Sequence, residues 1–249
     1  MATYTAEVIT LRATRIRDTE AVCRFYSAEH GKIEASARGI GRPGSKLTPA
    51  TELFVLSRAM FAEGRNLHHL TQCEVREAFY ALRTDVRRMG CAAFVVELID
   101  KTTEAGDPHP TIFELLKTTL GVLCEATNPH VVTWAFQAQY LPHIGIEPQM
   151  DACVSCGEAD GAQLVAFSPG LGGVLCRACA GEDDHRAICP GTRQTYIALM
   201  RLGPAGLDRL GMEPRVAREL AWLLNEHRQF HVEAEIRSAK FLAQLAGRL

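Results

Sequence analysis

Four cysteines in two CxxC pairs constrain this chain more than any other feature. Cys153 and Cys156 form the first pair, Cys176 and Cys179 form the second, and residues 157–175 separate them. Each CxxC turn directs two thiolates at one cation, and two such turns complete the tetrahedral sulfur cage that Zn²⁺ prefers. The spacing therefore predicts one structural Zn²⁺ per chain, because four thiolates leave no open coordination position for catalysis. Two disulfides, or two chance pairs, are the alternative.

The residues between the two pairs predict a hairpin. Residues 164–167 have the character of a short strand, residues 169–173 have the Pro and Gly content of a turn, and an apolar pair leads back to the second CxxC. We therefore predict a zinc-ribbon hairpin over residues 150–181. Cys189 is close enough in sequence to be considered as a spare ligand. The cysteines outside the pairs are expected to be reduced and mostly small core residues, as in a cytoplasmic protein: Cys23, Cys73, Cys91, Cys124 and Cys189.

Residues 1–80 have the pattern of a small β-barrel. Apolar and polar positions alternate and are interrupted by turn residues, which is typical of short strands. Five short strands in about eighty residues favour the five-stranded OB-fold, with an SH3-like barrel or an open sheet as alternatives. The five expected strands are Thr5–Leu11, Ala21–Ser27, Lys32–Arg38, Leu53–Phe61 and His69–Ala78.

Residues 81–249 are predicted to form a helical domain into which the hairpin is inserted, giving an α+β multidomain chain. The first helical segment has one apolar stripe expected to face the core: Leu82, Val86, Met89, Ala93 and Val96. Thr111 and Glu114 suggest a capping box for a helix that buries Leu116, Leu120 and Leu123, and Asn128-Pro129 suggests the start of the next. Three more helices are expected over residues 192–202, 214–230 and 235–247.

The sequence supports neither a known catalytic motif nor a known nucleotide-binding motif. Residues 39–44 match GxGxxG, but Pro49 disfavours the helix that a dinucleotide fingerprint requires. His227 and His231 have the i, i+4 spacing of a metal site, but Arg228 and Gln229 suggest a wet face. No stretch approaches the roughly 18 apolar residues of a membrane helix, and the start of the chain lacks a secretory signal. A cytoplasmic protein is therefore expected.

The order of its motifs makes the whole chain similar to the RecO family of bacterial recombination mediators. The matching segments include both halves of the cysteine site and pieces of the barrel and the helices: Gly31-Lys32-Ile33, Ala37-Arg38-Gly39, Phe113-Glu114-Leu115-Leu116, Gly145-Ile146-Glu147-Pro148, Cys153-Val154-Ser155-Cys156-Gly157, Gly172-Gly173-Val174-Leu175-Cys176 and Arg237-Ser238-Ala239-Lys240-Phe241-Leu242. A zinc knot alone is common to many families, whereas this order of pieces is much more specific.

The resemblance implies an N-terminal OB-fold, a helical C-terminal domain with the zinc hairpin, no enzymatic activity and no small-molecule substrate. It further implies binding to single- and double-stranded DNA, strand annealing, and work with RecR to load RecA onto strands coated by single-strand-binding protein, at the nucleoid. The acidic, hydrophobic C-terminal tail of that protein is expected in an apolar groove rimmed by Arg and Lys from residues 193–240. A zinc-ribbon adaptor that binds only protein partners is the alternative.

The cations of the barrel are the expected DNA contacts. The formal net charge is -2, but residues 12–46 hold eight Lys and Arg against four Asp and Glu. Alternation places Lys32 and Arg38 on one face of the third strand, and the Gly-rich tip carries Arg42 and Lys46 onwards. Arg12, Arg15 and Arg17, expected in the first inter-strand loop, form a second group. Scattered solubilising charges are the alternative. The candidate stacking platforms, Phe25, Tyr26, Phe54 and Phe61, could all be core residues, so phosphate contacts are expected to dominate.

Overall fold

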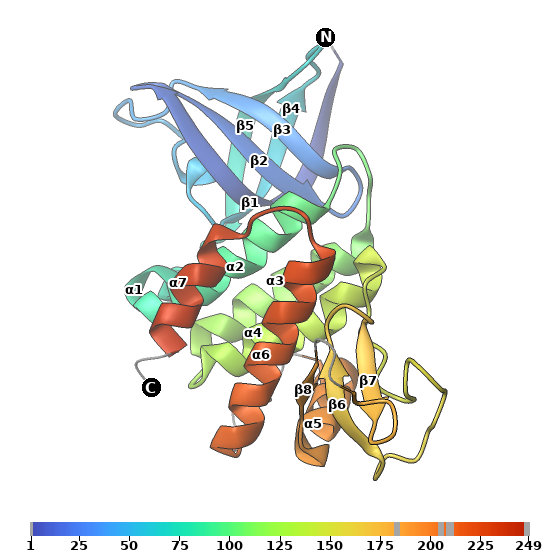
Figure 1. Cartoon of the computed structure of the whole chain (residues 1–249). Helices are drawn as coiled ribbons and strands as arrows, with labels where there is room; N and C mark the ends of the chain where they lie inside the picture. The colour runs from blue at the N-terminus through green and yellow to red at the C-terminus, as the bar shows by residue number, and fades with distance from the viewer. Residues whose placement is uncertain (1, 182–184, 204–206, 208–211, 247–249) are drawn as a thin grey trace. The chain divides into compact units, whose positions relative to one another are not determined.

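The structure of the chain is a computed structural model that describes residues 2–181, 185–203, 207 and 212–246 (Figure 1). The chain forms two compact units, one of residues 1–126 with 236–249 and the other of residues 127–235. Within the described residues, the first unit holds the barrel and four helices, and the second holds a three-stranded sheet and three helices. The units thus group the first helices with the barrel, and the domain boundary expected at residue 80 stays a prediction.

The N-terminal strands close into a five-stranded barrel, as the alternation predicts. Neighbouring strands follow the order β1-β2-β3-β5-β4, and β4 pairs back onto β1. All pairs are antiparallel except β3 with β5, which pair in parallel over three positions. The OB-fold barrel is confirmed, and an open sheet is excluded. The strands are β1 (Thr3–Arg17), β2 (Glu20–Ser27), β3 (Gly31–Arg38), β4 (Leu56–Ala62) and β5 (His68–Glu77).

β1 is longer than its alternation suggests. The sequence places Arg12, Arg15 and Arg17 in a loop, which is wrong, because the strand runs on to Arg17 and pairs there with Glu20. The register shifts between Thr10 and Arg12 and again between Arg15 and Arg17. Such irregularities break the period of two while the ladder continues, so this part of the strand does not look like one in the sequence.

The connection between β3 and β4 seals the barrel core. Ile40 and Ala50 from this connection are fully buried in one cluster with Phe25 and Phe61 of the strands. The hydroxyl of Thr10 donates to the carbonyl of Ala50 at 2.9 Å. Between β3 and β4 the chain forms only a 3₁₀ turn, η1 (Pro49–Thr51). The α-helix that a dinucleotide fingerprint requires after its glycines is therefore missing from this segment, as Pro49 predicts.

The helix α2 (Val86–Thr102) buries a different stripe from the predicted one. Val86 and Met89 are 52% and 40% exposed, so the expected inward face is wrong over its first half. Phe94, Val95 and Leu98 are buried instead, in line with Cys91 and Ile99 at three- and four-residue steps. A helix with this many apolar positions offers two such stripes, and only tertiary packing selects between them.

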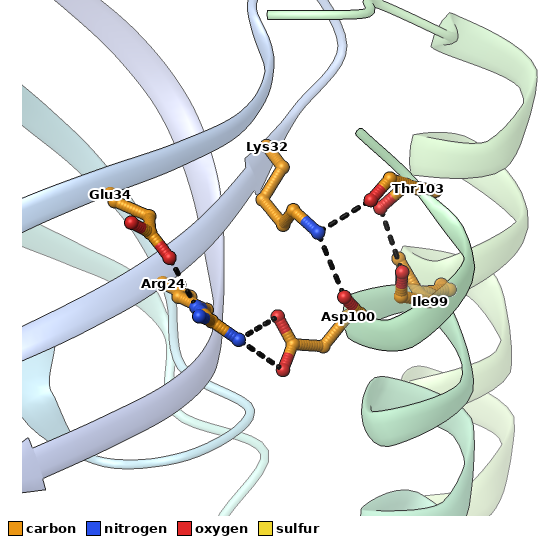
Figure 2. A network of polar contacts seen from close by, with 6 residues as sticks. All are labelled: Arg24, Lys32, Glu34, Ile99, Asp100 and Thr103. Carbon is orange, nitrogen blue, oxygen red and sulfur yellow. Dashed lines mark hydrogen bonds and ion pairs between the residues drawn. The ribbon is translucent and has the colours of Figure 1, made fainter. Parts of the chain in front are cut away.

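Polar side chains join α2 to the barrel (Figure 2). Nη1 of Arg24 in β2 lies 3.2 Å from Oδ2 of the buried Asp100 in α2, while its Nε donates to Glu34 in β3. The ammonium of Lys32 donates to the carbonyls of Asp100, at 2.8 Å, and of Thr103, at 2.5 Å. Because the last carbonyls of a helix lack partners within the helix, Lys32 caps the C-terminal end of α2.

The other helices of the first unit are α1 (Ala81–Thr84), α3 (Pro110–Glu125) and α7 (Arg237–Ala246). α3 buries Leu116, Leu120 and Leu123 as predicted, but it begins at Pro110, so Thr111 is already inside the helix and the proposed capping box is wrong. α7 lies beside α2 (Figure 1). The Glu97 carboxylate of α2 accepts hydrogen bonds from the backbone and hydroxyl of Ser238, which fixes the start of α7.

The second unit confirms the predicted hairpin and its surrounding helices. β6 pairs with β7 as expected and also with the short β8, which the sequence did not indicate. Leu220, Leu223 and Leu224 of α6 are fully buried in the core of this unit. The predicted helix end at residue 247 lies outside the described residues. Among the described helices, none is both long and apolar enough to cross a membrane. The elements are α4 (Pro129–Tyr140), η2 (Leu141–Ile144), β6 (Leu164–Ser168), β7 (Gly173–Cys176), β8 (Arg186–Ala187), α5 (Pro190–Leu202) and α6 (Pro214–His231).

Candidate functional site

The structure brings the four predicted cysteine ligands together. The sulfur atoms of Cys153, Cys156, Cys176 and Cys179 all lie within 4.8 Å of one another, and those of Cys156 and Cys176 are 3.7 Å apart. Four thiolates around one tetrahedral ion with metal–sulfur bonds of about 2.3 Å are separated by about 3.8 Å. The cluster therefore fits one metal ion, and it is the sole group of three or more potential ligand residues found in the described part of the chain.

Two tight turns and the end of a strand present these sulfurs. The backbone N–H of Gly157 donates to the carbonyl of Cys153, and that of Ala180 donates to the carbonyl of Cys176, both at 2.9 Å. Val154 donates to Val174 of β7 at 3.0 Å, which holds the first turn against the second strand of the hairpin. The geometry of the site thus depends on the β6–β7 hairpin.

The electrostatics of the cluster favour a cation. Burial opposes ionisation of Cys153, but the backbone N–H groups of Cys176, Cys156 and Ser155 outweigh it and lower the pKa of the thiol to about 6. The Glu158 backbone favours the Cys156 thiolate, yet hydrogen bonding with the neighbouring cysteines raises its pKa to about 12. One sulfur therefore ionises readily, and the accumulation of further negative charge requires a compensating cation.

Cys189 contacts the start of α5 and does not belong to the four-cysteine cluster. It precedes α5, its sulfur lies 3.3 Å from the hydroxyl oxygen of Thr192, and its backbone N–H donates to Glu219 at 2.7 Å. Glu219 also accepts from the Thr192 hydroxyl at 2.6 Å and pairs with Arg215 at 2.8 Å. This polar cluster satisfies the start of α5, and Cys189 is not part of the four-cysteine group.

His227 of α6 is not on a wet face, which corrects the prediction from sequence, whereas His231 is half-buried and Gln229 is exposed as predicted. His227 is 1% exposed, and its Nε2 lies 2.8 Å from the carbonyl oxygen of Ile146. Nε2 of His231 lies 2.9 Å from the carbonyl oxygen of Pro169 in the hairpin turn. Arg228, whose charge suggested contact with water, is itself buried. Both imidazoles therefore tie α6 to neighbouring loops of its own unit.

Acidification is expected to weaken the second unit between about pH 6.5 and pH 4. Burial lowers the pKa of His227 to about 4, helped by the charge of His231 and opposed by the hydrogen bond to Ile146. The unfolded chain takes up this proton at a higher pH than the folded chain, so the contribution is complete above pH 6.5 and is lost as the pH falls to 4. We expect a loss of about 3 kcal/mol in urea denaturation, and less pH dependence in His227→Gln. An unchanged pH profile in that variant would exclude His227 as the cause.

Exposed arginines gather at one end of the barrel. Arg17 of β1 and Arg38 of β3 both approach Glu20, with nitrogen to oxygen distances of 3.4 and 3.1 Å. The N–H of Gly39 donates to the carbonyl of Thr19 at 2.7 Å, so the connection that carries Arg42 starts beside the β1–β2 turn. The structure thus brings Arg17 of one predicted group of cations close to Arg38 of the other, although Glu20 balances part of their charge.

Lys32 is separated from those arginines. It lies near the opposite end of β3 from Arg38, where its ammonium already has two carbonyl acceptors, and burial lowers the pKa of its amine. Its partners lie 68 and 71 residues further along the chain, so no local pattern could reveal them. Its assignment as a DNA contact stays a prediction, and it is the least available of the seven cations.

Lys46 lines an open cavity of about 720 Å³ on the side of β4 and β5. Arg58 of β4 lies in the same lining, a cation that was not among the sequence candidates. Arg58 lies between Ser57 and Ala59, which are both fully buried. Because successive side chains of a strand point to opposite faces, Arg58 faces outwards, and the small residues on either side of it are the sequence signal for this orientation. Arg58 adds positive charge at this side of the barrel.

The aromatic residues considered as stacking platforms all belong to the protein interior. Phe25, Tyr26, Phe54 and Phe61 are at most 2% exposed. None of these four rings can stack on a base without a rearrangement of the fold. Tyr4, which no local sequence pattern singles out, is only partly buried and stacks on Phe61 with ring centroids 5.4 Å apart.

Comparison with known proteins gives one family over nearly the whole chain. A profile described as "Recombination protein O N terminal" matches residues 1–79, and a second, "Recombination protein O C terminal", matches residues 83–240. The chain belongs to the RecO family. Curated relatives named "DNA repair protein RecO" include that of Moorella thermoacetica, 31% identical over 246 residues, which span 98% of this chain and 92% of the relative. Those of Halalkalibacterium halodurans and Listeria monocytogenes are each 32% identical, over 97% and 96% of this chain and 95% and 93% of theirs.

Two glycines in the RecO-like segments lie where a side chain would collide. Gly31 has a φ of +62°, and a Cβ on it would approach the carbonyl oxygen of Asp107 to 2.1 Å. A Cβ on Gly173 would lie 2.5 Å from Cγ1 of Val154, in the turn that carries two of the sulfur ligands. The RecO-like segment at Gly31 therefore allows the barrel to contact the loop after α2. The segment at Gly173 allows the first CxxC turn to pack against β7.

Proposed function

We propose that this RecO family protein is a DNA repair and recombination mediator that binds single- and double-stranded DNA and anneals complementary strands. With RecR, it would help to load RecA onto strands coated by single-strand-binding protein. The observation that carries the proposal is the end-to-end RecO match of a chain whose N-terminal residues form a closed OB-fold barrel. In this proposal the protein acts by binding DNA and protein partners and converts no small molecule. Its proposed location is the cytoplasm, at the nucleoid.

DNA is proposed to contact the barrel end where the β1–β2 hairpin and the β3–β4 connection meet. Arg38 and Arg42 are exposed there, and Arg12, Arg15 and Arg17 extend the positive charge along β1. Lys46, further along the β3–β4 connection, is proposed to extend the contact to the side of β4 and β5. Arginine and lysine contacts to phosphates fix the position of a strand without reading its sequence. We therefore expect little sequence preference and a strong dependence on salt.

The metal is proposed to be one structural Zn²⁺. The ligand set is four thiolates with sulfur separations close to those of a tetrahedral site, which is the chemistry of structural zinc. The bound ion would supply fixed geometry to the hairpin. Arg and Lys of residues 193–240 remain the proposed contacts for the acidic tail of the single-strand-binding protein. Of these residues, Arg209 lies outside the described residues, and Arg237 and Lys240 belong to the first unit.

Charge reversal at Arg38 and Arg42 tests the proposed DNA interface. Each lost phosphate contact lowers the salt slope of binding by about 0.7 to 0.9, so two contacts correspond to roughly 25- to 60-fold weaker binding at 0.1 M salt. Binding of Arg38→Glu/Arg42→Glu to single- and double-stranded DNA would be measured across salt concentrations, with unlabelled competitor.

The matched control is Arg201→Glu/Arg218→Glu, which changes the net charge equally on exposed residues of the second unit. It should keep the salt slope of the wild type. If the barrel variant binds as the wild type does while the control loses affinity, DNA binds the helical unit. If the wild-type protein binds no DNA but does bind RecR, the chain is an adaptor for protein partners alone.

A further inference from the structure

A second cavity on the barrel is lined by three aromatic rings and by polar side chains. It has a volume of about 470 Å³, which is within the range of small-molecule sites. Tyr4 of β1, His30 of the β2–β3 turn and His68 of β5 line it, together with Asn66 and Glu63 of the β4–β5 connection. All these residues belong to the first unit.

The three rings contact one another around Tyr4. The Tyr4 centroid is 4.6 Å from that of His30 and 5.5 Å from that of His68, and the tyrosine also stacks on the buried Phe61. Tyr4 is thus held in place from behind while remaining partly exposed. Rings fixed in this way lose little conformational freedom when a planar ligand stacks on them, and stacking has no charge requirement.

One polar atom in this lining has no partner. Nδ1 of His68 is buried and makes no hydrogen bond within the protein, although buried polar atoms are nearly always paired. The side-chain amide of Asn66 offers both a donor and an acceptor. Burial and the charge of Glu63 raise the pKa of Tyr4, which keeps its hydroxyl protonated. The cavity thus offers hydrogen-bonding groups of both kinds beside its rings.

The charge of the lining argues against a phosphate here. Glu34 and Glu63 line the cavity, and the one Lys or Arg in the lining, Lys32, has its ammonium bound to carbonyls at the end of α2. A metal is not favoured either, because the described residues hold no ligand group beyond the four cysteines. The chemistry that remains is a planar, uncharged heteroaromatic ring with its own donors and acceptors.

We infer that this cavity takes one unstacked nucleobase of single-stranded DNA, which packs against the open side of the Tyr4–His30 ring pair and makes polar contacts to His68 and Asn66. The inference rests on the proposed DNA binding and adds to it. A base that is paired and stacked in a duplex cannot enter a cavity of this kind unless it is first extruded. The cavity therefore favours single strands, whereas the arginines at the other end of β3 serve either form of DNA.

Binding to matched oligonucleotides tests this inference. The wild type, Tyr4→Leu and His30→Ala would be measured against a thymidine oligonucleotide, an abasic strand of equal length and charge, and a duplex. We expect each variant to bind the thymidine strand roughly 5- to 30-fold more weakly and the duplex unchanged, as the loss of one stacked base predicts. The abasic strand should bind the wild type and the variants alike. Thermal melting would check that the variants fold, and 2-aminopurine fluorescence on the wild type gives a readout independent of substitution.

The outcomes separate the cavity from the barrel interface. If the wild type binds both forms of DNA, the variants bind the thymidine strand equally well, and 2-aminopurine shows no stacking, the cavity is not a base site although the proposed function stands. If the wild type binds no DNA, both proposals are overturned. Equal wild-type affinity for the thymidine and abasic strands would also overturn the inference.

Discussion

Removal of the metal from the four-cysteine site is expected to destabilise the second unit more than any other single change. Cys153 and Cys176 are 3% and 4% exposed and belong to the same hydrophobic core as Leu220 and Phe167. Metal binding at a structural site contributes directly to folding, on the order of 10 kcal/mol in small zinc modules. The loss should be smaller here, because helices also support the hairpin, but it should still amount to several kcal/mol.

The measurement compares Cys176→Ser with the wild type by metal analysis and by hydrogen exchange of the second unit. We expect one zinc per wild-type chain, little in the variant, and faster exchange over β6, β7 and α6. Cys189→Ser is the matched control, since its sulfur lies outside the cluster, and it should retain zinc. Wild-type protein purified without chelator and found free of zinc would contradict the zinc assignment.

Asp100→Ala is expected to have the second largest effect, on the first unit. Asp100 is 4% exposed and pairs with Arg24, whose side chain is 32% exposed. Breaking a buried ion pair leaves a partly buried charge without its partner, which costs about 3 kcal/mol or more. Because Arg24 keeps its contact with Glu34, we expect the free energy of unfolding, measured by urea denaturation, to fall by about 3 kcal/mol.

Glu34→Ala provides the comparison for Asp100→Ala. Glu34 pairs with the same arginine, but its side chain is 39% exposed. Removing a pair that is open to water costs about 1 kcal/mol or less. Equal losses in the two variants would show that burial of Asp100 does not set its contribution.

Local patterns were enough for the cysteine site and for the number of strands. The two CxxC turns and the Gly-rich turn between them lie within 27 residues, so their spacing alone brings the sulfurs together. The alternation of β3, from Lys32 to Arg38, likewise depends only on neighbours in sequence. A barrel of this length then leaves few arrangements for its strands.

Features set by distant partners were not predictable in the same way. The carbonyls that accept hydrogen bonds from Lys32 lie about seventy residues away in the sequence. Packing against other elements determines which apolar face of α2 is buried, and the loop at Ile146 contacts His227. Tyr4 was passed over because its neighbours His30 and His68 come from other strands and turns. In each case the sequence gives the chemical group, but only the fold gives its surroundings.

Annealing of complementary strands coated with single-strand-binding protein tests the mediator function most directly. The wild type is expected to accelerate annealing, and Arg38→Glu/Arg42→Glu to lose most of that acceleration while keeping its fold and zinc. The control for coated strands is Arg87→Glu/Lys101→Glu, on exposed residues of α2 outside both proposed interfaces, which should anneal like the wild type. Annealing at the wild-type rate by the barrel variant, or no acceleration by the wild type itself, would contradict a DNA mediator that acts through this barrel.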